Sequence, residues 1–455
     1  MKKYKIVFYS VAFILLIQCI GCKKYLDVKS DNSLVIPSTL NDLQALLDDA
    51  SNTNYNTPGF GGASADEYFT DQDTYNSYTV FNQHVYTWTN YKYKYPNDWG
   101  FAYSAIYNAN LCLERVALIS PSPKDILQWN NVKGSALFFR AYYFAELSWL
   151  FAKSYDAATA ETDLGIVLRL GSDFNVPSVR SSIKVSYEKI IADAKEAALY
   201  LPDNPQQSTR PSKCAAYGVL ARTYLSMRQY DSAGRYADLA LQIKNTLMDY
   251  NNPAEADGSA YYPFKRVNGE TVFYTTMNYF LAISHPLIGN AKVDTALFNS
   301  YDNNDLRKTI FFSAAGNYQQ FKGNYAADFA LFSGIATDEL LLTRAECFAR
   351  TNNKDAALND INLLLSKRYS TGTFIPVTAP TALALLPIIL TERKKELLFR
   401  GSLRWVDIKR LNKENANITL RRFIDNQNFS LPPNDNRYAL QIPADVIENS
   451  GIQQN

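Results

Sequence analysis

Apolar residues recur every three to four positions through most of the chain after residue 100. This spacing puts them on one face of a helix and predicts a mainly α-helical protein. The helices predicted in this way are 102–118, 126–153, 187–201, 211–228, 231–247, 338–350, 354–369 and 381–411. Pro387 lies inside the last pattern and predicts a later start or a bend there. A shorter helix at 40–50 is predicted to begin after a cap at Ser38 or Thr39.

Three stretches lack a helical period and are predicted to be large insertions: 51–98, 248–337 and 412–443. The first is rich in Gly, Asn, Asp and Tyr and is too long for a simple connection, so we expect a functional loop region. Within the second, residues 270–283 are β-branched and aromatic, which predicts short strands. We therefore expect residues 39–455 to form a single helical domain with irregular and short-strand insertions.

The helical pairs share a spacing of small residues. Ala345 and Ala357 in one pair have the same spacing as Ala221 and Ala233 in another. Tetratricopeptide units place small residues where the two helices of a hairpin touch, and the next repeat covers the remaining apolar face. The pattern predicts about four such hairpins. Ordinary alanine-rich helix packing is the alternative interpretation.

The N-terminus has the pattern of an export signal. Three lysines precede an apolar run at 6–20, which ends at Gly21-Cys22. The run is shorter than the roughly 20 apolar residues that a membrane-spanning helix needs. A small residue before a cysteine is the pattern of lipoprotein processing. We therefore predict a signal peptide at 1–21, a lipid on Cys22 and an extended tether at 22–38. An ordinary secretory leader with an incidental cysteine is the alternative.

Charge and cysteine content exclude several classes of function. The 46 basic and 44 acidic residues give a formal charge of +2, and loss of residues 1–21 removes three lysines and leaves −1. Nucleic-acid binding needs clustered positive charge, so no nucleic-acid partner is expected. Cys112, Cys214 and Cys347 are far apart and odd in number, which argues against a disulfide framework or a zinc site. With two histidines in the chain, we expect no metal and no cofactor.

Several segments follow the motifs of one family in that family's order. Near the N-terminus these are Lys23-Lys24-Tyr25-Leu26-Asp27-Val28 and Asp66-Glu67. Trp99, Tyr103, Ile106, Ala109 and Asn110 follow a W-x3-Y-x2-I-x2-A-N pattern, and 134–143 follows G-x-A-x3-R-A-x-Y. The strongest segment is 392–401, ERKKELLFRG, continued by Arg404, Trp405 and Asp407. Together these segments resemble the SusD/RagB family, the surface glycan-binding lipoproteins of Bacteroidetes.

The resemblance implies a SusD-like fold and a specific cellular role. Members of this family are lipid-anchored on the exterior face of the outer membrane, where they act as a lid over a SusC-like TonB-dependent transporter. They hold a glycan through surface aromatic rings and hydrogen bonds, present it for import, and are not enzymes. Three positions depart from the family pattern: Arg400 stands where Glu is usual, Ser450 replaces Pro, and Val167 stands where Gly-Ile-Pro is common.

The predicted ligand site lies in the insertions, where tyrosine is abundant. An aromatic ring covers the apolar face of a sugar, while Asn and Asp side chains bond its hydroxyl groups. The candidates in the first insertion are Tyr75, Tyr78, Tyr86, Trp88, Tyr91, Asn82 and Asn90, and those in the second are Tyr261, Tyr262 and Tyr279. For any one of these rings, ordinary packing is the alternative interpretation.

Charged residues of the strongest motif lie at helical spacing: Glu392, Arg393, Glu396, Arg404 and Asp407, beside Trp405. One interpretation of Glu392 and Glu396 is the paired carboxylates of a glycosidase. Residues four apart on one helix point the same way, however, and a substrate must lie between acid and base. The interleaved Arg and Lys also keep both carboxylates ionised. The motif therefore predicts a structural ion-pair network.

These observations favour a cell-surface glycan-binding lipoprotein that works with a transporter in nutrient uptake. A membrane-anchored tetratricopeptide adaptor for a protein or peptide is the alternative, and it predicts an uninterrupted helical groove without an aromatic loop platform. An exported hydrolase is a third class. It requires opposed carboxylates or a nucleophile with a base, and the sequence pattern shows neither.

Overall fold

The computed structural model describes residues 37–280, 282–285 and 290–455. The predicted signal peptide, Cys22 and all but the last residues of the predicted tether lie outside these ranges. Within them, Thr39–Asn455 form one unit by their contacts. No helix in the described ranges is long and apolar enough to cross a membrane.

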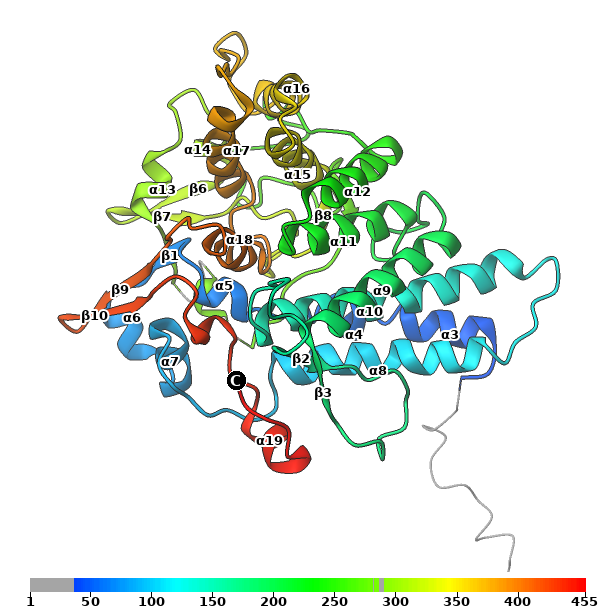
Figure 1. The fold of residues 1–455 in the computed structure, drawn as a ribbon. Coiled ribbons are helices and arrows are strands. Elements are labelled where there is room, and N and C mark those ends of the chain that lie inside the picture. Colours follow the sequence, from blue (N-terminus) through cyan, green and yellow to red (C-terminus); the bar gives the residue numbers. More distant parts are fainter. Residues whose placement is uncertain (1–36, 281, 286–289) are drawn as a thin grey trace, which may run out of the picture. The chain divides into compact units, whose positions relative to one another are not determined.

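Helices dominate the described part of the chain (Figure 1). The helices before residue 250 are α3 (Leu40–Leu47), α4 (Ala50–Thr53), α5 (Phe60–Ser64), α6 (Gln72–Ser77), α7 (Val80–Thr87), α8 (Asp98–Val116), α9 (Ile126–Phe151), α10 (Ile183–Tyr200), α11 (Lys213–Ser226) and α12 (Tyr230–Ile243). Those after it are α13 (Thr295–Asn299), α14 (Arg307–Ile310), α15 (Thr337–Arg350), α16 (Lys354–Ser366), α17 (Ala382–Glu396), α18 (Leu403–Asn412) and α19 (Ala444–Ser450), with the 3-10 turns η1 (Ala282–Ser284) and η2 (Asn436–Tyr438).

The long helices pack against their neighbours in chain order, from α8 through α12 and on to α15, α16 and α17. The small side chains that the repeat pattern places between helices, Ala221, Ala233, Ala345 and Ala357, are all buried. Most of α9 is buried, because α8 and α10 both pack against it. This arrangement confirms the prediction of a mainly α fold with tetratricopeptide-like hairpins.

The strands form antiparallel pairs. These are β1 (Tyr68–Phe69) with β5 (Lys292–Val293), β2 (Leu164–Val167) with β3 (Arg180–Ser182), β4 (Thr271–Phe273) with β8 (Ile335–Ala336), β6 (Phe312–Ala315) with β7 (Tyr318–Phe321), and β9 (Leu420–Ile424) with β10 (Gln427–Leu431). Of the described residues in the segment 270–283, which the sequence predicts as strand, only 271–273 form a strand, β4. Isolated bridges pair Thr276 with Phe332 and Met277 with Thr57. The β4–β8 pair brings residues 271–273 of the second insertion beside residues 335–336 near its end.

The first insertion is more regular than the sequence predicts. It contains α5, α6 and α7 and most of α4, so the expectation of a region without helices is wrong for these segments. Each helix is too short to display a sustained apolar period. Local caps start two of them, since the side chains of Asp71 and Thr79 accept hydrogen bonds from the first turns of α6 and α7.

The helix predicted at 381–411 is in fact two helices, α17 and α18. The chain turns between them at Phe399 and Gly401, whose φ angles of 55° and 56° lie in the left-handed region. Glycine adopts this conformation without steric cost, whereas phenylalanine rarely does. Pro387 does not delay the helix, because α17 begins at Ala382 and continues through the proline.

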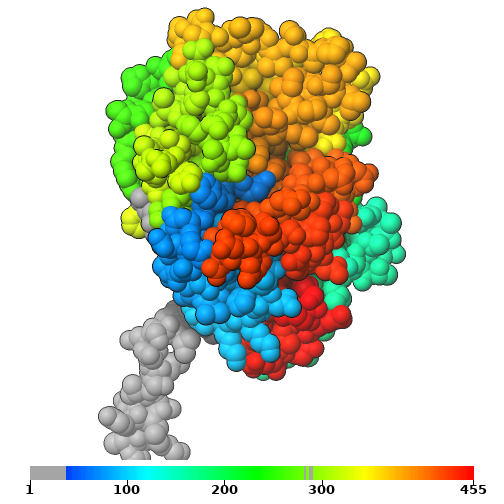
Figure 2. Space-filling model, turned by 90° about the vertical axis from the view of Figure 1, so that its left-hand side faces the viewer, coloured from blue at the N-terminus to red at the C-terminus, as the bar shows by residue number. Residues whose placement is uncertain are grey.

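The three insertions meet on one face of the unit (Figure 2). Strand β1 of the first insertion pairs with β5 of the second. The backbone N–H of Asp425, in the β9–β10 turn of the third, donates to Gln72 Oε1 of the first at 2.7 Å. The irregular parts of the chain therefore form a connected surface on the helical frame.

Candidate functional site

The second insertion contains an open cavity of about 330 Å³. Its walls come from residues 259–262, from His285 after η1, from the β6–β7 hairpin and from the segment 322–331. The lining side chains that matter below are Tyr261, Tyr262, His285, Gln320, Lys322, Asn324, Asp328 and Phe329. Two of the ligand residues predicted from the sequence, Tyr261 and Tyr262, thus share one cavity.

Aromatic rings with exposed surface border this cavity. Tyr261 is 59% exposed and Phe329 is 49% exposed. Tyr261 meets Tyr262 edge to face, with ring centroids 4.8 Å apart. Tyr279, which is 48% exposed, meets Phe329 edge to face at 6.0 Å. Edge-to-face contacts leave ring faces available to a further partner.

Buried hydrogen bonds hold the loop that carries Phe329. The Nδ2 group of the buried Asn324 donates to the carbonyls of Asp328 and Ala330 at 2.9 and 2.6 Å. Its Oδ1 atom accepts from the N–H of Phe332 at 2.9 Å. The position of Phe329 is therefore fixed before any ligand binds, which lowers the entropic cost of binding.

Lys322 connects two walls of the cavity, because its Nζ atom donates to the carbonyls of Gly258 and Ala260 at 2.5 and 3.4 Å. Desolvation lowers the pKa of Lys322, and burial also lowers the pKa of His285, whose ring contacts the Phe329 carbonyl. Asp328 is the carboxylate among the lining residues. Aromatic faces, amides and few charges suit an uncharged ligand rich in hydroxyl groups.

Tyr75 and Tyr78 of the first insertion lie beside this region. Tyr78 Oη donates to the carbonyl of Ile283 in η1 at 3.4 Å. Asn290 Nδ2 donates to Thr74 Oγ1, next to Tyr75, at 2.9 Å. The half-buried rings of Tyr75 and Tyr78 meet edge to face, with centroids 6.4 Å apart. They stay candidates at the border of the site.

Tyr86 is buried, which corrects the prediction that its ring faces a ligand. Trp88 is also mostly buried, but it lines a cavity together with Asn90 and Tyr91 and stays a candidate there. Tyr68, Tyr86 and Trp88 surround the guanidinium of Arg422, whose centre lies 5.0, 4.6 and 5.1 Å from their ring centroids, in that order. Trp88 Nε1 also donates to the Ser64 carbonyl at 3.0 Å. These cation–π contacts attach β9 of the third insertion to the first.

The remaining candidates of the first insertion lie elsewhere. Tyr91 and Asn90 border a separate cavity of about 230 Å³, whose other wall includes residues from 436–441. Asn82 lies in the first turn of α7, where its N–H donates to the capping Thr79. None of these three candidates is among the residues that line the cavity of the second insertion.

Glu392 and Glu396, the two carboxylates of the charged motif, form ion pairs with the same arginine and do not face each other across a gap. Arg307 on α14 reaches Glu392 with Nη2 at 2.5 Å and Glu396 with Nη1 at 2.9 Å. Glu392 and Glu396 lie on the same side of α17, as their spacing predicts. A substrate has no place between them, which excludes the glycosidase interpretation of this pair.

The rest of the motif ties the last helices to the first insertion. Arg393 Nε pairs with Asp407 at 2.8 Å, which joins α17 to α18. Arg404 donates two hydrogen bonds to Asp66 at 2.6 and 2.7 Å. Trp405 between these charges is fully buried. These contacts make the motif a structural ion-pair network.

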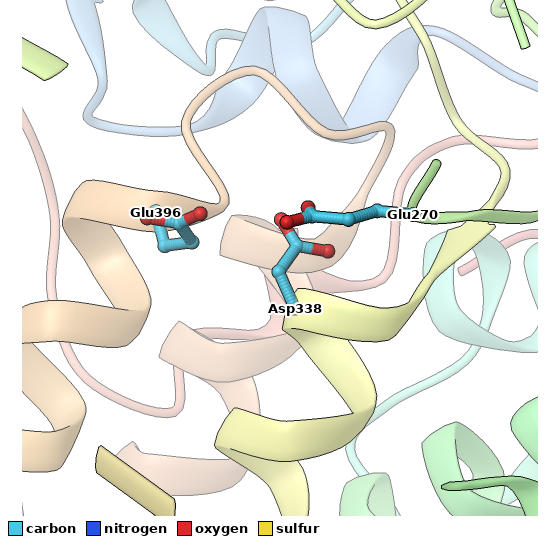
Figure 3. Close-up of side chains that lie close together, drawn as sticks. All are labelled: Glu270, Asp338 and Glu396. Carbon is cyan, nitrogen blue, oxygen red and sulfur yellow. The ribbon is translucent and has the colours of Figure 1, made fainter. Parts of the chain in front are cut away.

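Glu270, Asp338 and Glu396 bring carboxylate oxygens within 4.8 Å of one another (Figure 3). Arg368 donates to Glu270 and Glu396 at 2.8 and 2.7 Å, and Arg400 pairs with Asp338 at 2.7 Å. Burial raises the pKa of Glu270 to about 7. Burial also opposes ionisation of Glu396, but the positive charge of Arg368 outweighs it and holds the pKa of Glu396 below its ordinary value. A metal cation would meet two guanidinium groups here, so the residues fit an ion-pair network and not a metal site.

Comparison with known families agrees with this architecture. Residues 24–225 match the family described as starch-binding and associating with outer membrane, and residues 337–455 match the SusD family. The chain belongs to the SusD/RagB family.

Relatives of this SusD/RagB protein occur among curated proteins and solved structures. SusD-like protein P2 of Formosa agariphila is 24% identical over 417 residues, which cover 78% of this chain and 79% of the relative. A putative sugar binding protein from Bacteroides vulgatus has a TM-score of 0.73 at 19% identity, covering 92% of this chain and 99% of its own. A SusD superfamily protein from Bacteroides thetaiotaomicron has a TM-score of 0.73 at 20% identity, with the same coverage of 92% and 99%. These structures share the fold.

Sequence reasoning missed Lys322, Asn324 and Phe329 of this SusD/RagB protein. They lie in the segment that follows the β6–β7 hairpin, where Ala327 adopts a φ of 48°. The available signal was the turn-forming residues Gly323, Asn324 and Asp328, the last of which directly precedes Phe329. That signal indicates a turn that displays a ring, although it does not show which way the ring faces.

Proposed function

We propose that this protein is a cell-surface glycan-binding lipoprotein and that the cavity of the second insertion holds the glycan. The observation that carries the proposal is the exposed group of Tyr261, Tyr279 and Phe329 around a cavity with amide and hydroxyl groups. A ring face covers the C–H surface of a pyranose, while amides bond its hydroxyl groups. Membership of a family whose matched description is starch-binding supports a carbohydrate ligand.

We further propose that a lipid on Cys22 holds the protein on the exterior face of the outer membrane. There it would deliver the glycan to a SusC-like TonB-dependent transporter. The leader pattern and the family description support this location. The protein would bind and not cleave its ligand, because a glycosidase needs a pair of carboxylates and Asp328 is the carboxylate in the cavity lining.

Affinity gel electrophoresis on amylopectin, xylan, laminarin and pectin tests the proposal. We expect one of these polymers to retard the soluble protein. The double variant Tyr261→Ala and Phe329→Ala should bind that polymer about tenfold more weakly, because two exposed stacking rings are lost. Phe423→Ala removes an exposed ring that lines neither this cavity nor its border, and it should bind like the wild type.

The same experiment separates the other classes of function. Lack of retardation by any of the four polymers, together with binding to an immobilised peptide library, would favour a tetratricopeptide-type adaptor. Release of reducing sugar by the pure protein would favour a hydrolase. Melting temperatures of all variants should match the wild type, since the substituted rings are exposed.

A further inference from the structure

We infer that the loop 168–179, between β2 and β3, carries a second carbohydrate-binding site. This inference rests on the proposed function, since the ligand is of the same chemical class. A cleft of about 310 Å³ lies between this loop, α8 and α19. It is nearly as large as the cavity of the second insertion, at about 330 Å³. Figure 1 shows β2, β3 and α19 well apart from β6 and β7, so the two sites are separate.

An exposed ring marks the cleft. Phe174 is 77% exposed, and its ring stacks on Tyr107 with centroids 4.8 Å apart and planes at 19°. Tyr103 and Trp99, with ring centroids 4.9 Å apart, line the cleft as well. What distinguishes Phe174 from a single exposed ring is its place beside three further aromatic residues that line the same cleft, because clustered apolar surface in a cavity is typical of a binding site.

A buried chain of hydrogen bonds fixes the loop. Asn110 Nδ2 donates to the carbonyls of Arg169 and Gly171 at 2.8 and 3.3 Å. Asn110 Oδ1 accepts from Arg140 Nη1 at 3.0 Å. Arg140 is held in turn by Asp193 through two hydrogen bonds of 2.8 and 2.9 Å. Asn110 and Arg140 are residues of two family motifs, so the motifs position this loop.

Two further contacts hold the loop. Glu114 accepts a hydrogen bond from the N–H of Ser172 at 2.7 Å. Arg169 Nη2 donates to Ser178 Oγ at 2.8 Å. A loop held at both ends presents Phe174 in one orientation, which removes an ordering cost from ligand binding.

The polar residues of the cleft favour a sugar over a purely apolar partner. Ser172, Asp173, Asn449 and Ser450 lie among its aromatic rings. Hydroxyl, carboxylate and amide groups beside ring faces match a pyranose, which has C–H faces and hydroxyl edges. The structure therefore presents two separate rings to one polymer, Phe174 here and Phe329 in the second insertion.

Substitution of the exposed rings tests the second site. The probe is the polymer, among amylopectin, xylan, laminarin and pectin, that retards the wild type. Phe174→Ala should weaken binding about three- to tenfold, and combination with Tyr261→Ala and Phe329→Ala should abolish retardation. Phe423→Ala is the matched control, because Phe423 is a phenyl ring that is 64% exposed and lines neither site.

Hydroxyl-radical footprinting gives an independent readout. An oligosaccharide of the retarding polymer should protect Phe174 and Tyr107 and leave Phe423 unprotected. If Phe174→Ala binds like Phe423→Ala while the Tyr261 and Phe329 variants bind weakly, the second site does not exist and the proposed function stands. If no polymer retards the wild type, the proposed function and this inference both fail.

Discussion

Arg400 and Asp338 form a buried ion pair, with Arg400 Nη2 2.7 Å from Asp338 Oδ2. The guanidinium also lies over the ring of Tyr325, 3.7 Å from its centroid. Asp338 lies beside the carboxylates of Glu270 and Glu396, so the arginine supplies positive charge to an acidic cluster.

Arg400→Met should lower the free energy of unfolding by about 3 kcal/mol, because it leaves Asp338 buried without its cation. Arg400→Glu should be more destabilising, since it adds a fourth carboxylate to the cluster. Urea denaturation followed by circular dichroism measures both. Arg421→Met, at an exposed position on β9, is the control and should change stability little. A fully stable Arg400→Glu protein would show that the ion pair is dispensable.

Glu146 should make stability depend on pH. Burial raises the pKa of Glu146 to about 8 from its ordinary value of 4.5. The folded protein therefore keeps a proton that the unfolded chain releases, and stability falls as pH rises from 4.5 to 8. Each unit of difference in pKa corresponds to about 1.4 kcal/mol. Glu146→Gln stays neutral at every pH, so this decline should become shallower.

Denaturation midpoints at several pH values between 5 and 8 measure the effect of Glu146→Gln. Glu188→Gln, at an exposed position on α10, is the matched control and should keep the decline of the wild type. Equal slopes for the Glu146 variant and the wild type would mean that Glu146 does not bind a proton in the folded protein in this range.

The helical frame was predictable because long helices display their period. Helix α9 starts at the predicted residue 126 and ends at Phe151, two residues before the predicted end at 153. The break between α17 and α18 was not predictable in this way. The ring centroid of Phe399 lies 6.4 Å from that of Tyr68 and 5.0 Å from that of Phe321. Both partners come from insertions that are distant in the sequence. Phe399 therefore adopts a left-handed backbone conformation, which phenylalanine rarely does, at a position where its ring packs against distant parts of the chain.

The candidate site was predictable only in part, for a related reason. Tyr261 and Tyr86 both lie in tyrosine-rich insertions, and sequence composition does not distinguish them. Tyr86 is buried against Arg422, far along the chain, whereas Tyr261 keeps an exposed face. A ring that has a partner within the protein cannot be distinguished by composition from a ring that awaits a ligand. The fold decides between them.

Asn324→Ala should loosen the loop that carries Phe329. The substitution removes the side-chain amide that donates to the buried carbonyl of Ala330 and accepts from the N–H of Phe332. We expect a loss of about 2 kcal/mol and faster hydrogen exchange confined to 324–332. Asn317→Ala, at an exposed position in the β6–β7 turn, is the control and should leave exchange unchanged. Exchange as slow as in the wild type would show that other contacts hold the loop.

Cys22→Ser should release the protein from the membrane. Cys22 lies outside the described residues, so this prediction depends on the sequence pattern of the leader. A diacylglycerol contributes about 0.8 kcal/mol per buried methylene, and its loss removes the anchor. Cell fractionation and labelling with radioactive palmitate measure the change. Cys19→Ser is the matched control, because Cys19 belongs to the predicted signal peptide and should leave both label and membrane attachment intact. If Cys19→Ser loses the label and Cys22→Ser keeps it, the processing site lies three residues earlier than predicted.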